Sequence, residues 1–259
     1  MKYLNEIHQI WDRLADYPAA QSQQALRYLL KEISQLIDAD IGYWISAFRL
    51  DELDASRDFM LGWRPGPICF SEELPEDENT YNKHKKEIDS GRYEVGESTL
   101  NHVKQSGKFR ATLLRDHVSE DFFDSDIYAN KFKSRNVTDT LYVVAPLNVD
   151  TEAYFCFQRI GRQAPFTSSD LDIASYTLRS LNWFQKKVFL SYGLLVAEKP
   201  LTHTEKKIIH LLLTDLSEKQ IADKLQQKVD TIHKHIVNIY RKFNVNSRAA
   251  LMAIWLGHF

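Results

Sequence analysis

The sequence predicts an α+β protein in two parts, with an antiparallel sheet flanked by helices over residues 1–195 and an all-α domain of four helices over residues 196–259. Three observations support this prediction. The 259 residues suffice for two domains. Before residue 161, β-branched and aromatic residues dominate several short runs, as in strands. After Leu201 these runs stop, and apolar residues recur at helical spacing.

Two helices are predicted at the start of the chain. Apolar residues recur at three- and four-residue spacing over residues 4–17, and Pro18 ends this run because its ring cannot continue a helix. A second amphipathic run covers residues 21–37. Both are expected to flank the strands that follow.

Five strands are predicted in the first part, and those nearest its end carry the clearest pattern. The predicted strands are 41–50, 59–63, 109–114, 140–147 and 153–160. The Arg-Pro-Gly-Pro run at 64–67 is a predicted loop, and a hairpin turn is expected at 148–152.

A solvated loop and helix are predicted over residues 71–92, and further helices at 97–106, 120–135 and 167–191. Along the last of them, apolar residues recur with three- and four-residue spacing, which fits either packing on the sheet of its own domain or a parallel dimer contact. The order of elements resembles the layout of GAF-type or PAS-type sensory domains. That resemblance implies a regulatory domain that binds a signal.

Aromatic and basic side chains are the candidates for a ligand site in this part. A pocket over a sheet has aromatic walls and a few polar anchors. The candidate residues are Trp44, Trp63, Arg115, Tyr128 and Tyr142. An ordinary aromatic core without a ligand, or a surface for a protein signal, fits the same residues.

Charge is distributed unevenly along the chain. Residues 200–259 hold nine Lys and Arg against five Asp and Glu, whereas the other residues hold 24 against 30. A basic module on an acidic body favours contact with a polyanion.

Several classes of protein are disfavoured by what the sequence lacks. No stretch reaches about 18 apolar residues and no signal peptide begins the chain, so we expect a cytoplasmic protein without a membrane partner. Cys69 and Cys156 form no CxxC pattern, which predicts reduced thiols. Because GxSxG, HExxH, P-loop and GxGxxG patterns are missing, we expect neither an enzyme, nor a metal site, nor a cofactor.

Four helices are predicted after Leu201, at 203–213, 218–225, 230–243 and from Ser247 to near Gly257. The second is short, and a turn of three or four residues joins it to the third. This is the arrangement of a helix-turn-helix, whose second member enters the major groove of DNA.

The third of these helices has two distinct faces. Its apolar stripe spans about 60° and is expected to face the core. The stripe consists of Ile232, Ile236, Ile239 and Phe243. Lys234, Val237 and Arg241 lie opposite. Lys and Arg neutralise phosphates, and a valine suits contact with a thymine methyl group, so this face predicts contact with double-stranded DNA.

Residues 201–251 resemble the LuxR-type helix-turn-helix of bacterial regulators. The matching positions are Leu201, Thr202, Glu205, Ser217, Ile221, Ala222, Leu225, Thr231, Ile232, His235, Ile239, Lys242, Val245, Ser247, Arg248 and Ala249. Two positions depart from the family: Asp215 stands where a glycine usually follows the first helix, and Lys228 replaces a common serine.

The resemblance implies a domain that dimerises through its last helix on a two-fold-related DNA site. By this resemblance His233, Lys234 and Val237 occupy base-reading positions. The positions that it places near phosphates are Lys228, Thr231, Asn238, Arg241 and Lys242. Arg248 either contacts a phosphate or holds the corner between the third and fourth helices.

The sequence therefore predicts a homodimeric, sequence-specific transcription regulator that is controlled by a small-molecule or protein signal, with RNA polymerase as a further candidate partner. One alternative is a protein-interaction adaptor or antagonist whose helical tail does not read DNA. Another is an acyl-homoserine-lactone-type quorum-sensing receptor, although the spacing of the aromatic residues does not match the pockets of those receptors.

Overall fold

The structure, a computed structural model, describes residues 3–49, 58–90, 94–148, 151–161, 164–192 and 201–256. The chain divides into two compact units. The first comprises Met1–Asp12 and Leu26–Asn182, and the second comprises Arg13–Ala25 and Trp183–Phe259. The predicted domain boundary between residues 195 and 196 lies outside the described residues.

A five-stranded sheet forms the centre of the first unit, in the order β2-β1-β5-β4-β3. Its strands are β1 (Ile41–Arg49), β2 (Trp63–Phe70), β3 (Arg110–Leu113), β4 (Val137–Asn148) and β5 (Thr151–Ile160). Every neighbouring pair is antiparallel. The predicted α+β class, with an antiparallel sheet and flanking helices, is confirmed.

Helices account for most of the remaining described residues up to Arg179. The α-helices are α1 (Leu4–Asp16), α2 (Ser22–Leu36), α3 (Pro75–Asp89), α4 (Glu97–Lys104), α5 (Leu114–His117), α6 (Asp126–Lys131) and α7 (Ser168–Arg179), and the 3-10 helices are η1 (Ala19–Gln21), η2 (Glu120–Asp124) and η3 (Lys133–Arg135). The single helix predicted over residues 120–135 is wrong, because η2, α6 and η3 divide this segment.

The second strand lies later in the chain than its composition predicts. The described residues before it form a tight turn, in which the Asp58 carboxylate accepts hydrogen bonds from the backbone N–H groups of Met60 and Gly62 at 3.2 and 2.8 Å. The strand predicted at 59–63 is therefore wrong, and the predicted loop at 64–67 belongs to β2. Proline is tolerated there because β2 is an edge strand.

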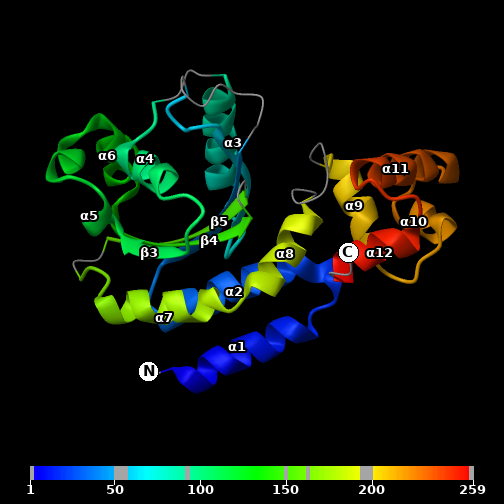
Figure 1. Ribbon diagram of the computed structural model, residues 1–259, viewed down its shortest axis with the longest axis horizontal. Coiled ribbons are helices and arrows are strands. Elements are labelled where there is room, and N and C mark those ends of the chain that lie inside the picture. Colours follow the sequence, from blue (N-terminus) through cyan, green and yellow to red (C-terminus); the bar gives the residue numbers. More distant parts are fainter. Residues whose placement is uncertain are drawn as a thin grey trace. The chain divides into compact units, whose positions relative to one another are not determined.

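The two faces of the sheet have different neighbours. Figure 1 shows α2 and α7 along one face and α3 and α4 over the other. Gly42 of β1 faces α2, since a Cβ atom at this position would lie 2.5 Å from the Ser34 Oγ atom. The missing side chain thus allows α2 to pack close to the sheet.

The helix predicted over 167–191 is broken. α7 ends at Arg179, and α8 (Asn182–Ser191) begins as a separate helix. α7 packs against β3 and β4, and its Ala174 and Leu178 are fully buried. Of the two interpretations of its apolar residues, packing on the sheet therefore fits the structure.

The second unit contains α8 and four further helices, namely α9 (His203–Leu212), α10 (Glu218–Lys224), α11 (Val229–Lys242) and α12 (Arg248–Leu256). Their apolar faces form one core, to which Ile208, Ile221, Ile236 and Trp255 contribute. Ala19 of η1 also packs against this core, so a segment near the start of the chain belongs to the unit. The sequence did not predict this contribution.

Candidate functional sites

The outward face of α11 is the first candidate site. Ile232, Ile236 and Ile239 are buried, as predicted. On the opposite side Lys234 and Arg241 are exposed, and Val237 is 49% exposed. An exposed valine between two cationic side chains suits DNA, because the valine can contact a thymine methyl group while the cations contact the flanking phosphates.

The start of α11 is set by the turn that follows α10. Gln226 has a φ angle of 53°, and the backbone N–H of Gln227 donates to the Ala222 carbonyl oxygen at 3.0 Å. Lys228 then occupies the N-cap position without a side-chain cap bond. Lys228 and Thr231 are both exposed at the start of α11.

The turn between α9 and α10 accommodates Asp215 in place of the family's usual glycine. The described residues with a positive φ angle do not include Asp215. An aspartate can therefore adopt this backbone conformation without the strain of the left-handed region.

Two polar contacts orient side chains on α11. The Nδ1 atom of His233 lies 3.0 Å from the Glu218 Oε2 atom on α10. Asn238 accepts a hydrogen bond of 2.9 Å through its Oδ1 atom from Arg241. Glu218 was not predicted, and the signal that the sequence holds for it is its place in the first turn of α10.

Lys242 and Arg248 are engaged within the domain. The Lys242 Nζ atom lies 2.7 Å from the Glu205 Oε2 atom. Arg248 donates to the carbonyl oxygens of Leu216, at 2.7 Å, and of Thr214. Arg248 therefore ties α12 to the turn between α9 and α10, rather than to the corner between α11 and α12.

Taken together, the geometry of the second unit defines a helix-turn-helix domain. α10 is short, three backbone steps separate its C-cap Leu225 from the N-cap Lys228, and α11 presents a polar and cationic face. This is the general class of protein to which the fold assigns the unit.

The second candidate site is a cavity of about 350 Å³ in the first unit. It lies between the sheet and a layer formed by α3, α4, η2 and α6. Trp63 and Tyr142, two of the predicted ligand residues, line it. Tyr43, Ile45 and Tyr154 add apolar and aromatic surface from β1 and β5.

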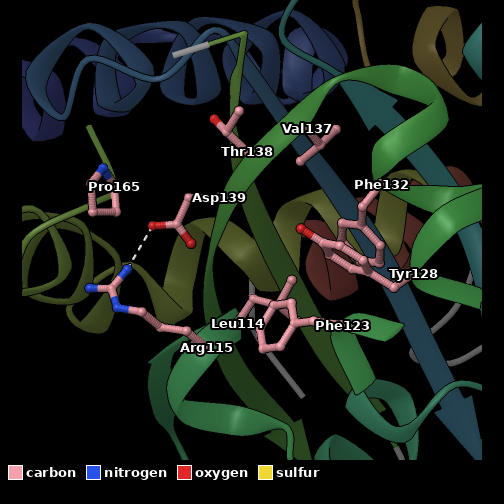
Figure 2. A pocket seen from close by; sticks show the side chains of 9 residues that line it. All are labelled: Leu114, Arg115, Phe123, Tyr128, Phe132, Val137, Thr138, Asp139 and Pro165. Carbon is pink, nitrogen blue, oxygen red and sulfur yellow. Dashed lines mark hydrogen bonds and ion pairs between the residues drawn. The ribbon is translucent and has the colours of Figure 1, made fainter. Parts of the chain in front are cut away.

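The other predicted ligand residues lie elsewhere. Arg115 and Tyr128 line a separate pocket of about 100 Å³ (Figure 2). Arg115 is paired there with Asp139 at 2.7 Å and donates to the Phe166 carbonyl oxygen at 2.7 Å. Its guanidinium group thus holds three parts of the chain together. The Tyr128 ring stacks on Phe132 at 5.3 Å between centroids.

Trp44 lines neither of these two pockets. Side chains alternate between the faces of a strand, and its neighbours Tyr43 and Ile45 face the cavity of about 350 Å³. Trp44 is fully buried on the other face of the sheet, beside Gly42 and α2. We therefore correct its predicted role from a pocket wall to a core residue.

A buried polar cluster borders the cavity of about 350 Å³. Arg110 of β3 is paired with Glu152 of β5 at 2.8 Å, and the Tyr154 hydroxyl donates to the same carboxylate at 3.0 Å. The Nε–H of Arg110 donates to the Nδ1 atom of His102 at 3.4 Å. Burial, followed by the nearby His117 and Arg110, holds the pKa of His102 well below its ordinary value.

His102 and Gln158 line the cavity and were not predicted. His102 sits in a polar helix, where nothing in the sequence distinguishes it from a surface residue. Gln158 did carry a signal, because it is a polar residue inside the apolar run 153–160. A buried amide in such a strand requires a hydrogen-bond partner.

No helix in the described part of the chain is both long and apolar enough to span a bilayer.

Comparison with known proteins supports the assignment of the second unit. Residues 199–255 match the model of the family described as "Bacterial regulatory proteins, luxR family". The nitrate/nitrite response regulator protein NarP of Escherichia coli (strain K12) is 43% identical over 56 residues, which are 22% of this chain and 26% of NarP. The chain thus matches about a quarter of that relative. Residues 199–255 form a LuxR-type helix-turn-helix domain, as the resemblance predicted.

Two solved structures are similar to the chain in fold. SdiA in complex with octanoyl-rac-glycerol gives a TM-score of 0.49 at 14% identity, covering 100% of this chain and 96% of that chain. The VqsR LBD domain from Pseudomonas aeruginosa gives a TM-score of 0.48 at 16% identity, covering 70% of this chain and 94% of that chain.

Proposed function

We propose that this protein is a cytoplasmic, sequence-specific regulator of transcription that binds double-stranded DNA through α11. The observation that carries the proposal is the outward face of α11, where Lys234, Val237 and Arg241 are exposed opposite the buried isoleucines. The LuxR-type match of residues 199–255 supports it independently.

The proposed contacts divide into two groups. His233, Lys234 and Val237 lie in the first nine residues of α11 and read base edges in the major groove. The residues that contact phosphates are Lys228, Thr231, Asn238, Arg241 and Lys242. Lys242 also stabilises the domain through Glu205, and Arg248 holds the turn between α9 and α10.

We further propose that the protein binds its operator as a homodimer. α12 supports this proposal because Met252 is 36% exposed, and an apolar side chain on the last helix favours contact with a second copy. A two-fold-related dimer requires an operator with two similar half-sites. RNA polymerase is the partner that such a regulator would contact at a promoter.

The first unit is proposed to hold the controlling signal. The cavity of about 350 Å³ falls in the size range of small-molecule sites and is lined largely by aromatic and apolar side chains. If the protein has two states that differ in DNA affinity, a ligand that binds one state more tightly shifts the protein toward that state. The resulting change in DNA affinity is limited by the difference between the ligand's affinities for the two states.

Selection of DNA from a random pool, followed by affinity measurement at several salt concentrations, tests the DNA proposal. We expect one enriched sequence, and affinity that falls steeply as salt rises because phosphate contacts release counterions. Lys234→Ala and Val237→Ala should each weaken binding to that sequence by about 10-fold, since each removes a contact to bases or their methyl groups.

Lys207→Ala is the matched control, because Lys207 is an exposed lysine on α9 rather than α11. Its affinity should stay within about twofold of the unmodified protein. If no sequence is enriched, the protein is an adaptor or antagonist and the proposal is wrong. The assignment of α11 is wrong if both α11 variants bind the selected sequence as tightly as the unmodified protein.

A further inference from the structure

A carboxylate at the start of α10 contacts the exposed face of α11. The Glu218 Oε2 atom lies 3.0 Å from the Nδ1 atom of His233, although 15 residues separate the two in sequence. The side chains of His233 and Glu218 are 61% and 40% exposed. A pair so open to water contributes little to folding stability, so its consequence lies in how it orients the imidazole ring and places the ring proton.

The contact with Glu218 determines which ring nitrogen of His233 carries the proton. An ionised carboxylate only accepts hydrogen bonds, so the Nδ1 atom of His233 is the donor. A neutral imidazole holds a single ring proton, which leaves its Nε2 atom with a free lone pair. The neutral ring therefore presents an acceptor at Nε2, whereas the protonated ring presents a donor at the same atom.

An acceptor and a donor at the Nε2 atom of His233 favour different bases in the major groove. Cytosine offers there only its N4 amino group, which donates, whereas guanine offers only N7 and O6, which accept. The neutral ring thus matches cytosine, and the protonated ring matches guanine. Adenine has both kinds of group and does not discriminate between the two states of the ring.

The charged surroundings of the pair leave Glu218 as the group that places the proton. The other charged or titratable side chains next to the pair along α10 and α11 are Lys219, Asp230, Lys234 and Tyr240. None of these four bonds to the His233 ring among the described contacts. Burial first, and Glu218 second, raise the pKa of Tyr240, so its hydroxyl stays neutral where histidine titrates. α9 also packs against α11, but its Glu205 is paired with Lys242.

We propose that Glu218 is a positioning residue that sets which base His233 reads, cytosine when the ring is neutral and guanine when the ring is protonated. This inference rests on the proposed function of α11 in reading DNA. The base preference of the protein then changes with pH at one position of each half-site. Val237 carries no charge and reads its base alike at every pH.

Operator variants bound by the unmodified full chain test this change of preference. The operator selected from a random pool is synthesised with cytosine or guanine at each position, and affinities are measured at pH 5.5 and 8.5 at constant salt. The position that His233 reads is the one whose base preference disappears in His233→Ala. There we expect cytosine to be preferred by about fivefold at pH 8.5 and guanine by about fivefold at pH 5.5, since each state of the ring gains one hydrogen bond with its matching base.

Glu218→Gln keeps the size of the side chain, but its amide can donate as well as accept, so the ring proton is free to occupy Nε2. The neutral ring then donates to guanine as the protonated ring does. The preference should therefore change by less than about twofold between the two pH values. The Ser217 and Gln220 capping box is untouched by this substitution, so the start of α10 is preserved.

Asp223→Asn is the matched control, because Asp223 is an exposed carboxylate of α10 that makes no contact with His233 among the described residues. It removes the same charge and should retain the full change of preference with pH. Loss of either charge strengthens phosphate attraction for every sequence alike, so the ratio of affinities for cytosine and guanine is not affected by that term.

Nitrogen NMR of the histidine rings at pH 8.5 measures the position of the proton without DNA, and His233→Ala identifies the signal. In the unmodified protein we expect the proton on Nδ1 of His233. In Glu218→Gln the share of the form with the proton on Nε2 should increase.

The proposal is overturned if the unmodified protein carries the proton on Nε2 of His233, if its base preference at the His233 position is the same at both pH values, or if Glu218→Gln keeps the full change. The first two results stand even if Glu218→Gln does not fold, and Glu218→Ala is the second variant for the third. A protein that selects DNA without a change of preference with pH refutes this inference alone, whereas one that selects no DNA refutes the proposed function.

Discussion

Gln226 illustrates how a single backbone conformation sets the geometry of the DNA-binding unit. Its φ angle of 53° lies in the left-handed region, directly after the end of α10. The chain reverses there, so that the N–H of Gln227 reaches back to the Ala222 carbonyl oxygen. This ending is usually made by glycine, because a side chain disfavours the left-handed conformation.

Gln226→Gly should stabilise the second unit by about 0.5–1 kcal/mol. Removing the side chain relieves a left-handed cost of about 1–2 kcal/mol, and the added freedom of glycine in the unfolded chain offsets part of the gain. Hydrogen exchange of α10 and α11 amides measures the change. Gln227→Gly is the control, because Gln227 is not among the described residues with positive φ and should gain no stability.

Single residues also show where sequence reasoning reaches its limit. Val237 and Lys234 were predicted to be exposed because the 3.6-residue period of a helix fixes which side chains oppose the core. The place of His102 at the cavity could not be predicted, because it depends on how α4 packs against Arg110 of β3 and the rest of the sheet. The candidate Trp44 was wrong because a one-residue shift along a strand moves a side chain to the opposite face.

At the scale of elements, a pair of side chains joins α9 to α11. Glu205 is 5% exposed and Lys242 is 17% exposed in their ion pair, and Glu205 also accepts a hydrogen bond of 2.7 Å from the Thr202 backbone N–H. Burial tends to raise the pKa of Glu205, but the hydrogen bonds from Lys242 and Thr202 prevail and lower it. The ionised carboxylate is therefore part of the native fold.

Lys242→Met should destabilise the α9–α11 packing by about 1–2 kcal/mol at pH 7, because it leaves a largely buried carboxylate without its cation. Since the folded pKa of Glu205 is lowered, this stabilisation is present above the ordinary glutamate pKa. It is lost as the pH falls through the lower folded pKa. Hydrogen exchange at pH 7 and in acid measures both effects.

Lys224→Met provides the comparison, because Lys224 is exposed on α10 and has no ion partner among the described contacts. Its effect should stay within about 0.5 kcal/mol. Equal destabilisation by the two variants would contradict the role assigned to the pair of Glu205 and Lys242.

Other elements departed from their predicted bounds for identifiable reasons. The segment 120–135 was predicted as one polar helix, yet Ser125 is extended and caps a new helix, so the segment divides there. Asn136, with a φ angle of 55°, ends the last short helix. β2 contains Pro65, which sequence rules assign to a loop. A proline is tolerated in β2 because β2 lies at the edge of the sheet, and only the fold determines which strand is at the edge.

At the scale of the whole molecule, stability should fall as the pH is lowered. Burial lowers the pKa values of both His102 and His117, and their rings lie 4.0 Å apart between centroids. Arg110 of β3 contacts His102 and is itself paired with Glu152 of β5, and Arg110 and Glu97 both act on His117. Protonating either ring would add charge to a largely buried cluster.

Unfolding measured by urea at pH 7.5 and 5.5 should show a loss of about 1 kcal/mol for each buried histidine. The sign follows from the unfolded chain, which binds protons near pH 6.5 while the folded histidines do not. His102→Gln should reduce the pH dependence even if it lowers stability at both values. An unchanged dependence in this variant would show that His102 does not contribute.

The sequence by itself determined the fold class, the LuxR-type domain and the outward face of α11, because these follow from local periodicity and a short run of matching residues. Only the tertiary structure decided two other features. One is the division into units, in which η1 joins the core of the second unit. The other is the cavity of about 350 Å³ in the first unit. The cavity is built from β1, β5, α3 and α4, which are distant in sequence. Hydrogen-bond partners and voids at such a site depend on how those elements pack, and no local pattern encodes that packing.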